Sequence, residues 1–140
     1  MNRRRRKKLS GRLVVAVLIG DLARVRALLR AGAPAETADS AGTTPLYQAA
    51  VNGDAGIVRV LLAAGASPDT ESGTGSEGTP LCGAACWGHT EAVRALLEHG
   101  ADPNLREDHG TGLSPLDWAV KGPYPETVEL LTAAGARPRD

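Results

Sequence analysis

The stretch GTPLCGAACWGHTEAVRALLEHGADPN, residues 78–104, decides the fold because its pattern occurs again elsewhere in the chain. A similar stretch, GTTPLYQAAVNGDAGIVRVLLAAGASPD, occupies residues 42–69. The Thr-Pro-Leu motif that starts at residues 44 and 79 returns as Ser-Pro-Leu at residue 114, so successive motifs lie 35 residues apart. A period of this size indicates stacked repeats, in which each unit is one supersecondary element.

A second marker, the dipeptide Gly-Ala, closes each unit. It begins at residues 32, 65, 100 and 135, with spacings of 33, 35 and 35 residues, and a Val-x-x-Leu pattern precedes it each time. The two markers keep the same register along the chain. They define four units, at about residues 10–36, 37–69, 70–104 and 105–138.

Within a unit, the residues predict two short antiparallel helices. Thr79 before Pro80 is typical of a helix N-cap followed by proline at the first helical position. Ala84 and Ala85 allow a neighbouring helix to approach closely, and Gly88 is expected to end the helix in the left-handed conformation. The Val-x-x-Leu-Leu pattern then places apolar side chains on one face of a second helix. Because such a pair cannot bury that face alone, the units are expected to stack.

This pattern resembles the ankyrin repeat over about residues 11–138. The resemblance implies an all-α solenoid of stacked helix-turn-helix units joined by β-hairpin-like loops. The chain departs from the family after Thr-Pro-Leu, where the usual histidine is replaced by Tyr47, Cys82 and Asp117. We expect this replacement to remove a hydrogen bond that links loops in the family. The first unit also lacks the Thr-Pro-Leu start, and KGPYP, residues 121–125, interrupts the turn of the fourth.

Equal numbers of basic and acidic residues, 16 of each, conceal a basic segment at the start of the chain. Residues 1–8, MNRRRRKK, hold six basic residues, which leaves ten basic against sixteen acidic residues elsewhere. We expect residues 1–9 to form a disordered basic tail. Two roles stay open for it: a solvated leader, or an anchor for nucleic acid or another anionic surface. The side chains concerned are Arg3, Arg4, Arg5, Arg6, Lys7 and Lys8.

The apolar run LVVAVLI, residues 13–19, is too short to span a bilayer, which needs about 20 residues. No cleavage motif of a signal peptide follows it. We therefore expect a soluble cytoplasmic protein, or a nuclear one if the source is eukaryotic. A monomer is expected, and self-association through this apolar run is the alternative.

Cys82, Cys86 and His89 follow an i, i+4, i+7 spacing that would bring three metal ligands to one face of a continuous helix. Gly88 interrupts that helix, and a structural zinc site needs four ligands, for which no second Cys or His pair is suitably spaced. The Gly-rich GTGSEG, residues 73–78, lacks the lysine of a phosphate-binding loop. We predict no metal, no cofactor and no catalytic site.

The resemblance implies a module that binds another protein, because ankyrin repeats usually bind partners on a concave side made of loop tips and first helices. Trp87, with Cys86 beside it, is the strongest candidate contact. The alternative is that Trp87 packs on neighbouring helices, as we expect of Trp118. The predicted contacts on first helices are Leu18, Ile19, Val51, Asn52, Cys86, Trp87 and Lys121. The predicted contacts at loop tips are Ser40, Ala41, Thr43, Ser76, Glu77, Thr111 and Leu113.

Overall fold

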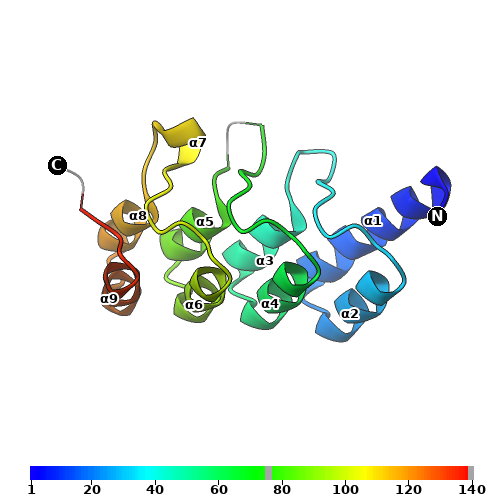
Figure 1. The fold of residues 1–140 in the computed structure, drawn as a ribbon, viewed down its shortest axis with the longest axis horizontal. Coiled ribbons are helices and arrows are strands. Elements are labelled where there is room, and N and C mark those ends of the chain that lie inside the picture. Colours follow the sequence, from blue (N-terminus) through cyan, green and yellow to red (C-terminus); the bar gives the residue numbers. More distant parts are fainter. Residues whose placement is uncertain (75–76, 139–140) are drawn as a thin grey trace.

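The computed structural model describes residues 1–74 and 77–138, and in these ranges the chain forms stacked pairs of helices (Figure 1). The predicted all-α repeat solenoid is confirmed, and no strand occurs in the described part of the chain. The helices are α1 (Arg3–Ile19), α2 (Leu22–Arg30), α3 (Pro45–Asn52), α4 (Ala55–Ala63), α5 (Pro80–Cys86), α6 (Thr90–Glu98), α7 (Glu107–Gly110), α8 (Pro115–Lys121) and α9 (Pro125–Ala133).

The helices form two layers that run the length of the molecule. The inner helices α1, α3, α5 and α8 are the first of each pair, and each contacts the next inner helix along the stack. The outer helices α2, α4, α6 and α9 make the second layer in the same order (Figure 1). Long loops join one pair to the next and project on the side of the inner helices.

The predicted capping residues begin the inner helices. The hydroxyl of Thr44 accepts a hydrogen bond from the Tyr47 N–H, and that of Thr79 accepts one from the Cys82 N–H, at 3.2 and 3.1 Å. Ser114 does the same for α8, where the Asp117 carboxylate also accepts from the Ser114 N–H and completes a capping box. Proline follows each of the three caps at the start of its helix.

The core lies between the two layers and consists of small and medium-sized aliphatic residues. The paired alanines Ala84 and Ala85 of α5 are 0 % exposed, as are Val93 and Leu96 of α6. The equivalent residues of the preceding unit are also buried. Side chains this small let neighbouring helices pack closely, which explains how a chain with 3 % aromatic residues builds a buried core.

One hydrogen bond recurs at the same position of successive units and fixes their register. It joins a backbone N–H that follows an outer helix to a side-chain oxygen in the corresponding segment of the unit before. The three bonds are Ser67 N–H to Glu36 Oε1 (2.7 Å), Asp102 N–H to Asp69 Oδ1 (3.0 Å) and Arg137 N–H to Asn104 Oδ1 (2.9 Å).

The expectation of a disordered tail over residues 1–9 is wrong from Arg3 onward, because α1 begins there. The Asn2 side chain accepts a hydrogen bond from the Arg5 N–H at 2.8 Å and caps this helix. Leu9 is only 6 % exposed, so the additional turns are attached to the core. Arginine and lysine are good helix formers, and no glycine or proline lies between them and the buried Leu9.

The loops between helix pairs are here called the first, second and third fingers, and they comprise residues 31–44, 64–79 and 99–114. Backbone hydrogen bonds close each finger, among them Asp39 N–H to Thr43 O, Ser72 N–H to Gly78 O, and Glu107 N–H to Leu113 O, at 2.9 to 3.0 Å. The fingers are therefore hairpin-like without forming strands among the described residues. None of the helices in residues 1–74 and 77–138 has the length and apolar character needed to cross a membrane.

Candidate functional site

Trp87 lies at the C-terminal end of α5, and its side chain is 61 % exposed. Gly88 follows with φ of +69°, so the chain leaves α5 in the predicted left-handed conformation. A large indole left in solvent at this position favours the interpretation of Trp87 as a contact residue over that of a packing residue. On the first inner helix, the apolar Leu18 and Ile19 are also exposed, at 56 % and 66 %.

A cleft of about 330 Å³ lies beside Trp87, between the inner helices and the second and third fingers. Three of the predicted contact residues, Glu77, Cys86 and Trp87, line it. The sequence did not single out four of the others as contacts: Tyr47, Glu107, Asp108 and Trp118. The remaining lining residues are Cys82 and Gly83.

Most other predicted contacts lie outside this cleft. Leu18 and Thr43 line a much smaller hollow of about 40 Å³ near the first finger. Ser76 lies outside the described residues. Six predicted contacts are exposed but line neither cavity: Ile19, Ser40, Ala41, Asn52, Thr111 and Lys121. The other two predicted contacts outside both cavities, Val51 and Leu113, are partly buried.

Glu77 connects the first two fingers. Its carboxylate accepts hydrogen bonds from the hydroxyl of Thr43, at 2.9 and 3.0 Å, and from that of Ser72, at 2.8 Å. The Ser72 hydroxyl in turn accepts from the Thr44 N–H at 2.9 Å. These bonds place a carboxylate at the edge of the cleft and hold two loops together.

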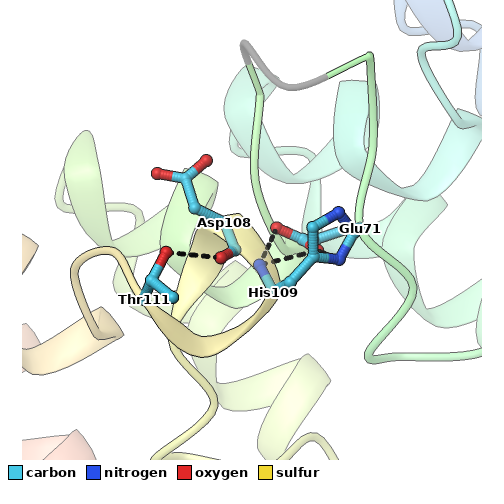
Figure 2. A network of polar contacts seen from close by, with 4 residues as sticks. All are labelled: Glu71, Asp108, His109 and Thr111. Carbon is cyan, nitrogen blue, oxygen red and sulfur yellow. Dashed lines mark hydrogen bonds and ion pairs between the residues drawn. The ribbon is translucent and has the colours of Figure 1, made fainter.

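Glu71 and His109 connect the second and third fingers (Figure 2). The backbone N–H of His109 donates to both carboxylate oxygens of Glu71 at 3.2 Å, and His109 Nδ1 lies 3.0 Å from Glu71 Oε2. The hydroxyl of Thr111 donates to the Asp108 carbonyl at 2.7 Å on the other side of the turn. Asp108 and His109 both have φ of +54°, a region that residues other than glycine rarely adopt.

Cys82 contributes to the base of the third finger. Its buried Sγ lies 3.6 Å from the Leu113 carbonyl oxygen and 3.9 Å from that of Leu105, within the range of weak S–H hydrogen bonds. Thus the cysteine that replaces the family's histidine still connects a helix to a finger. The prediction that this replacement removes the hydrogen bond to a loop is therefore wrong for the third unit. Burial raises the pKa of the Cys82 thiol to about 12, so the thiol is neutral at physiological pH.

The three residues considered as metal ligands have separate structural roles. His89 Nε2 lies 3.0 Å from the Val51 carbonyl oxygen, at the end of the preceding inner helix, while Cys82 faces the third finger. Cys86 borders the cleft and is a free thiol. In residues 1–74 and 77–138, no three side chains of His, Cys, Asp or Glu gather as a metal site would require.

The electrostatic environment of the cleft is negative. Burial and, to a smaller extent, the nearby carboxylates of Glu77 and Glu107 together raise the pKa of Tyr47 to about 12. Burial also raises the pKa of Glu107; the hydrogen bond from Trp118 opposes this rise, while the nearby charges of Asp108 and Glu71 add to it. The neighbouring carboxylates account for part of these rises, and it is their negative charge that favours a cation nearby.

Trp118 is half-buried and packs against the core, as predicted, but it also forms part of the cleft. Its indole Nε1–H donates to Glu107 Oε1 at 2.9 Å. The one signal for this role in the sequence is the indole itself, since a half-buried tryptophan N–H usually needs an acceptor. Which acceptor it meets depends on the path of the third finger, and the repeat pattern does not specify that path.

Two family models match the chain. A model described as ankyrin repeats in three copies matches residues 68–140, and a model of the single ankyrin repeat matches residues 41–72. No curated protein is significantly similar to the chain.

Proposed function

Because this chain belongs to the ankyrin repeat family, whose repeats generally mediate protein–protein interactions, we propose that it is a non-catalytic module that binds a partner protein on its finger side. The binding surface would be the concave face, formed by the inner helices and the fingers. The observation that carries this proposal is Trp87, which stands 61 % exposed beside the cleft. Buried indoles are frequent sources of binding free energy at interfaces.

The arrangement of the fingers supports the same proposal. The bonds of Glu77 and of Glu71 tie neighbouring fingers together in the free protein. Loops that are ordered before binding lose less conformational entropy when a partner docks. The face is therefore suited to recognition of a partner without prior folding of the loops.

The proposal is tested by affinity capture from lysate of the native source, followed by identification and purification of the captured protein. Wild-type protein is compared with Trp87→Ala and with Arg94→Ala, a change on an outer helix. The proposed face requires that the same partner is lost with Trp87→Ala and kept with Arg94→Ala. A partner retained equally by all three proteins would contradict it.

A second candidate function, binding of nucleic acid or another anionic surface, is favoured by the basic start of α1. Residues 3–8 are all exposed, and the ion pairs formed among the described residues involve none of them. Arg4, Arg5, Lys8 and Arg12 line a shallow groove of about 390 Å³ together with Asn2 and Leu9. The first turn of α1 has no acidic residue, so these cations lie uncompensated at the positive end of the helix dipole.

This second candidate predicts salt-dependent binding to a non-specific DNA duplex. If all six basic side chains engage phosphates, the affinity should fall with salt on a logarithmic slope of about −5. In a variant with residues 3–8 changed to glutamine, α1 should still form, because glutamine is a good helix former. The affinity of this variant for DNA should no longer depend on the salt concentration, because glutamine carries no charge. Equal binding by this variant, by a deletion of residues 1–8 and by the wild type would contradict the candidate.

A further inference from the structure

The lining of the cleft beside Trp87 indicates the chemistry of the partner. We propose that this cleft receives an arginine side chain from a basic segment of the partner protein. The inference rests on the proposed function, since it assumes that a partner docks on this face, and it adds the chemical group that the cleft selects.

The cleft combines aromatic rings with carboxylates. Tyr47 comes from α3, Trp87 from the end of α5 and Trp118 from α8, while Glu77 and Glu107 come from the second and third fingers. Asp108 adds a third carboxylate, and none of the lining residues is basic. Aromatic faces attract cations through their quadrupole, and carboxylates attract them through charge.

The hydrogen bonds of these carboxylates leave their charge uncompensated. Glu77 accepts from two hydroxyl groups, those of Thr43 and Ser72, and Glu107 accepts from the Trp118 indole. All three donors are neutral, so they orient the carboxylates without cancelling the negative charge. The raised pKa of Tyr47 follows from burial and from these same charges.

A cation of the chain itself already lies near one of these rings, that of Trp118. Lys121 Nζ is 5.6 Å from the centre of the Trp118 ring, within the range of a cation–π contact. Lys121 is exposed and does not line the cleft, so it marks the attraction of the site for a cation without filling it. A guanidinium suits the cleft better than an ammonium, because its plane can stack on an indole while its edge donates to carboxylates.

The third finger holds Asp108 in place before binding. Asp108 and His109 adopt the left-handed conformation, which is unfavourable for residues other than glycine. The contacts of His109 with Glu71 and the hydrogen bond from Gly112 N–H to Glu107 O, at 2.8 Å, maintain this turn. The turn therefore fixes the backbone of Asp108, a residue that lines the cleft, before a partner binds.

The charge of the chain outside residues 1–8 also favours a basic partner. Outside residues 1–8, acidic residues outnumber basic ones by sixteen to ten, which promotes the approach of a positively charged segment. The six basic residues at positions 3–8 lie at the start of α1, at the end of the stack away from α7 (Figure 1). They are therefore not placed to fill the cleft of the same molecule.

The test uses the full-length protein and three fluorescein-labelled peptides, with binding measured by fluorescence anisotropy. One peptide alternates arginine and leucine, the second replaces arginine by its neutral analogue citrulline, and the third replaces it by glutamate. We expect the arginine peptide to bind at least about tenfold more tightly than the citrulline peptide. Trp87→Ala should remove most of this preference.

Asp108→Asn provides the conservative test, since asparagine also tolerates the left-handed conformation. It should weaken binding of the arginine peptide about threefold and leave the citrulline peptide unchanged. Glu98→Gln is the matched control, because it removes an exposed carboxylate from the outer helix α6 and should have no effect.

Several results would overturn the inference: no binding of the arginine peptide, equal binding of the arginine and citrulline peptides, tighter binding of the glutamate peptide, or equal losses for Asp108→Asn and Glu98→Gln. Doubling of the molar mass at low salt, abolished by Trp87→Ala, would assign the cleft to a second copy instead.

If Trp87→Ala weakens binding of all three peptides alike, the face binds without charge selection, and the proposed function stands while the inference fails. If Trp87→Ala changes neither peptide binding nor partner capture, both fail.

Discussion

Replacement of Leu96 by alanine is expected to lower the free energy of unfolding by about 3 kcal/mol. Leu96 is 0 % exposed and lies in α6, between the outer helices α4 and α9. The substitution removes buried apolar surface and leaves a cavity in a core that lacks large side chains able to fill it. In a repeat protein, stability depends on the interfaces between neighbouring units. The third unit has a neighbouring unit on each side, so damage to it should weaken its contacts with both.

Chemical denaturation monitored by far-UV circular dichroism measures this change. The matched variant is Leu131→Ala, which removes the equivalent residue of α9, also 0 % exposed. Because α9 contacts an outer helix on one side only in the described part of the chain, we expect a smaller loss. Val120→Ala, at a side chain that is 57 % exposed, should change stability by about 0.5 kcal/mol or less. A loss for Leu96→Ala no larger than that for Val120→Ala would contradict the packing described here.

Replacement of Trp87 by alanine is expected to weaken partner binding by about 2 kcal/mol, which is about thirtyfold in Kd. The same change should alter the free energy of unfolding by about 0.5 kcal/mol or less, because the indole is largely in solvent. This separation of affinity from stability distinguishes a contact residue from a packing residue. Isothermal titration calorimetry with the purified partner gives the first quantity, and chemical denaturation gives the second.

Arg94→Ala serves as the control for affinity, since it changes an exposed side chain on the outer helix α6. Binding by this variant should equal that of the wild type. A Trp87→Ala variant that binds normally but unfolds more easily would show that the indole stabilises the fold, and the alternative interpretation from the sequence would then be correct.

The repeat architecture could be predicted from the sequence because it depends on short-range signals. Thr79, Pro80 and Gly88 act through their own backbone preferences, and the alanine pairs act through their small size. The extent of α1 could not be predicted in the same way. A run of charges was interpreted as disorder, whereas burial of Leu9 in the core fixes the helix in place.

The cleft was only partly predictable, for a different physical reason. Trp87 and Cys86 follow from the register of the repeat, which places the end of each inner helix on one face. Asp108 and Glu107 depend on the path of the third finger, and a left-handed pair of residues and a contact with Glu71 in another finger set that path. Such long-range contacts leave no periodic signal in the sequence.

The central claim, that the finger side is the binding face, is tested most directly by hydrogen–deuterium exchange of the full-length protein with and without its purified partner. The account predicts that amide protection increases in α3, α5 and the second and third fingers, while the outer helices α4, α6 and α9 exchange as before. Protection that increases on the outer helices and leaves α5 and the fingers unchanged would contradict it.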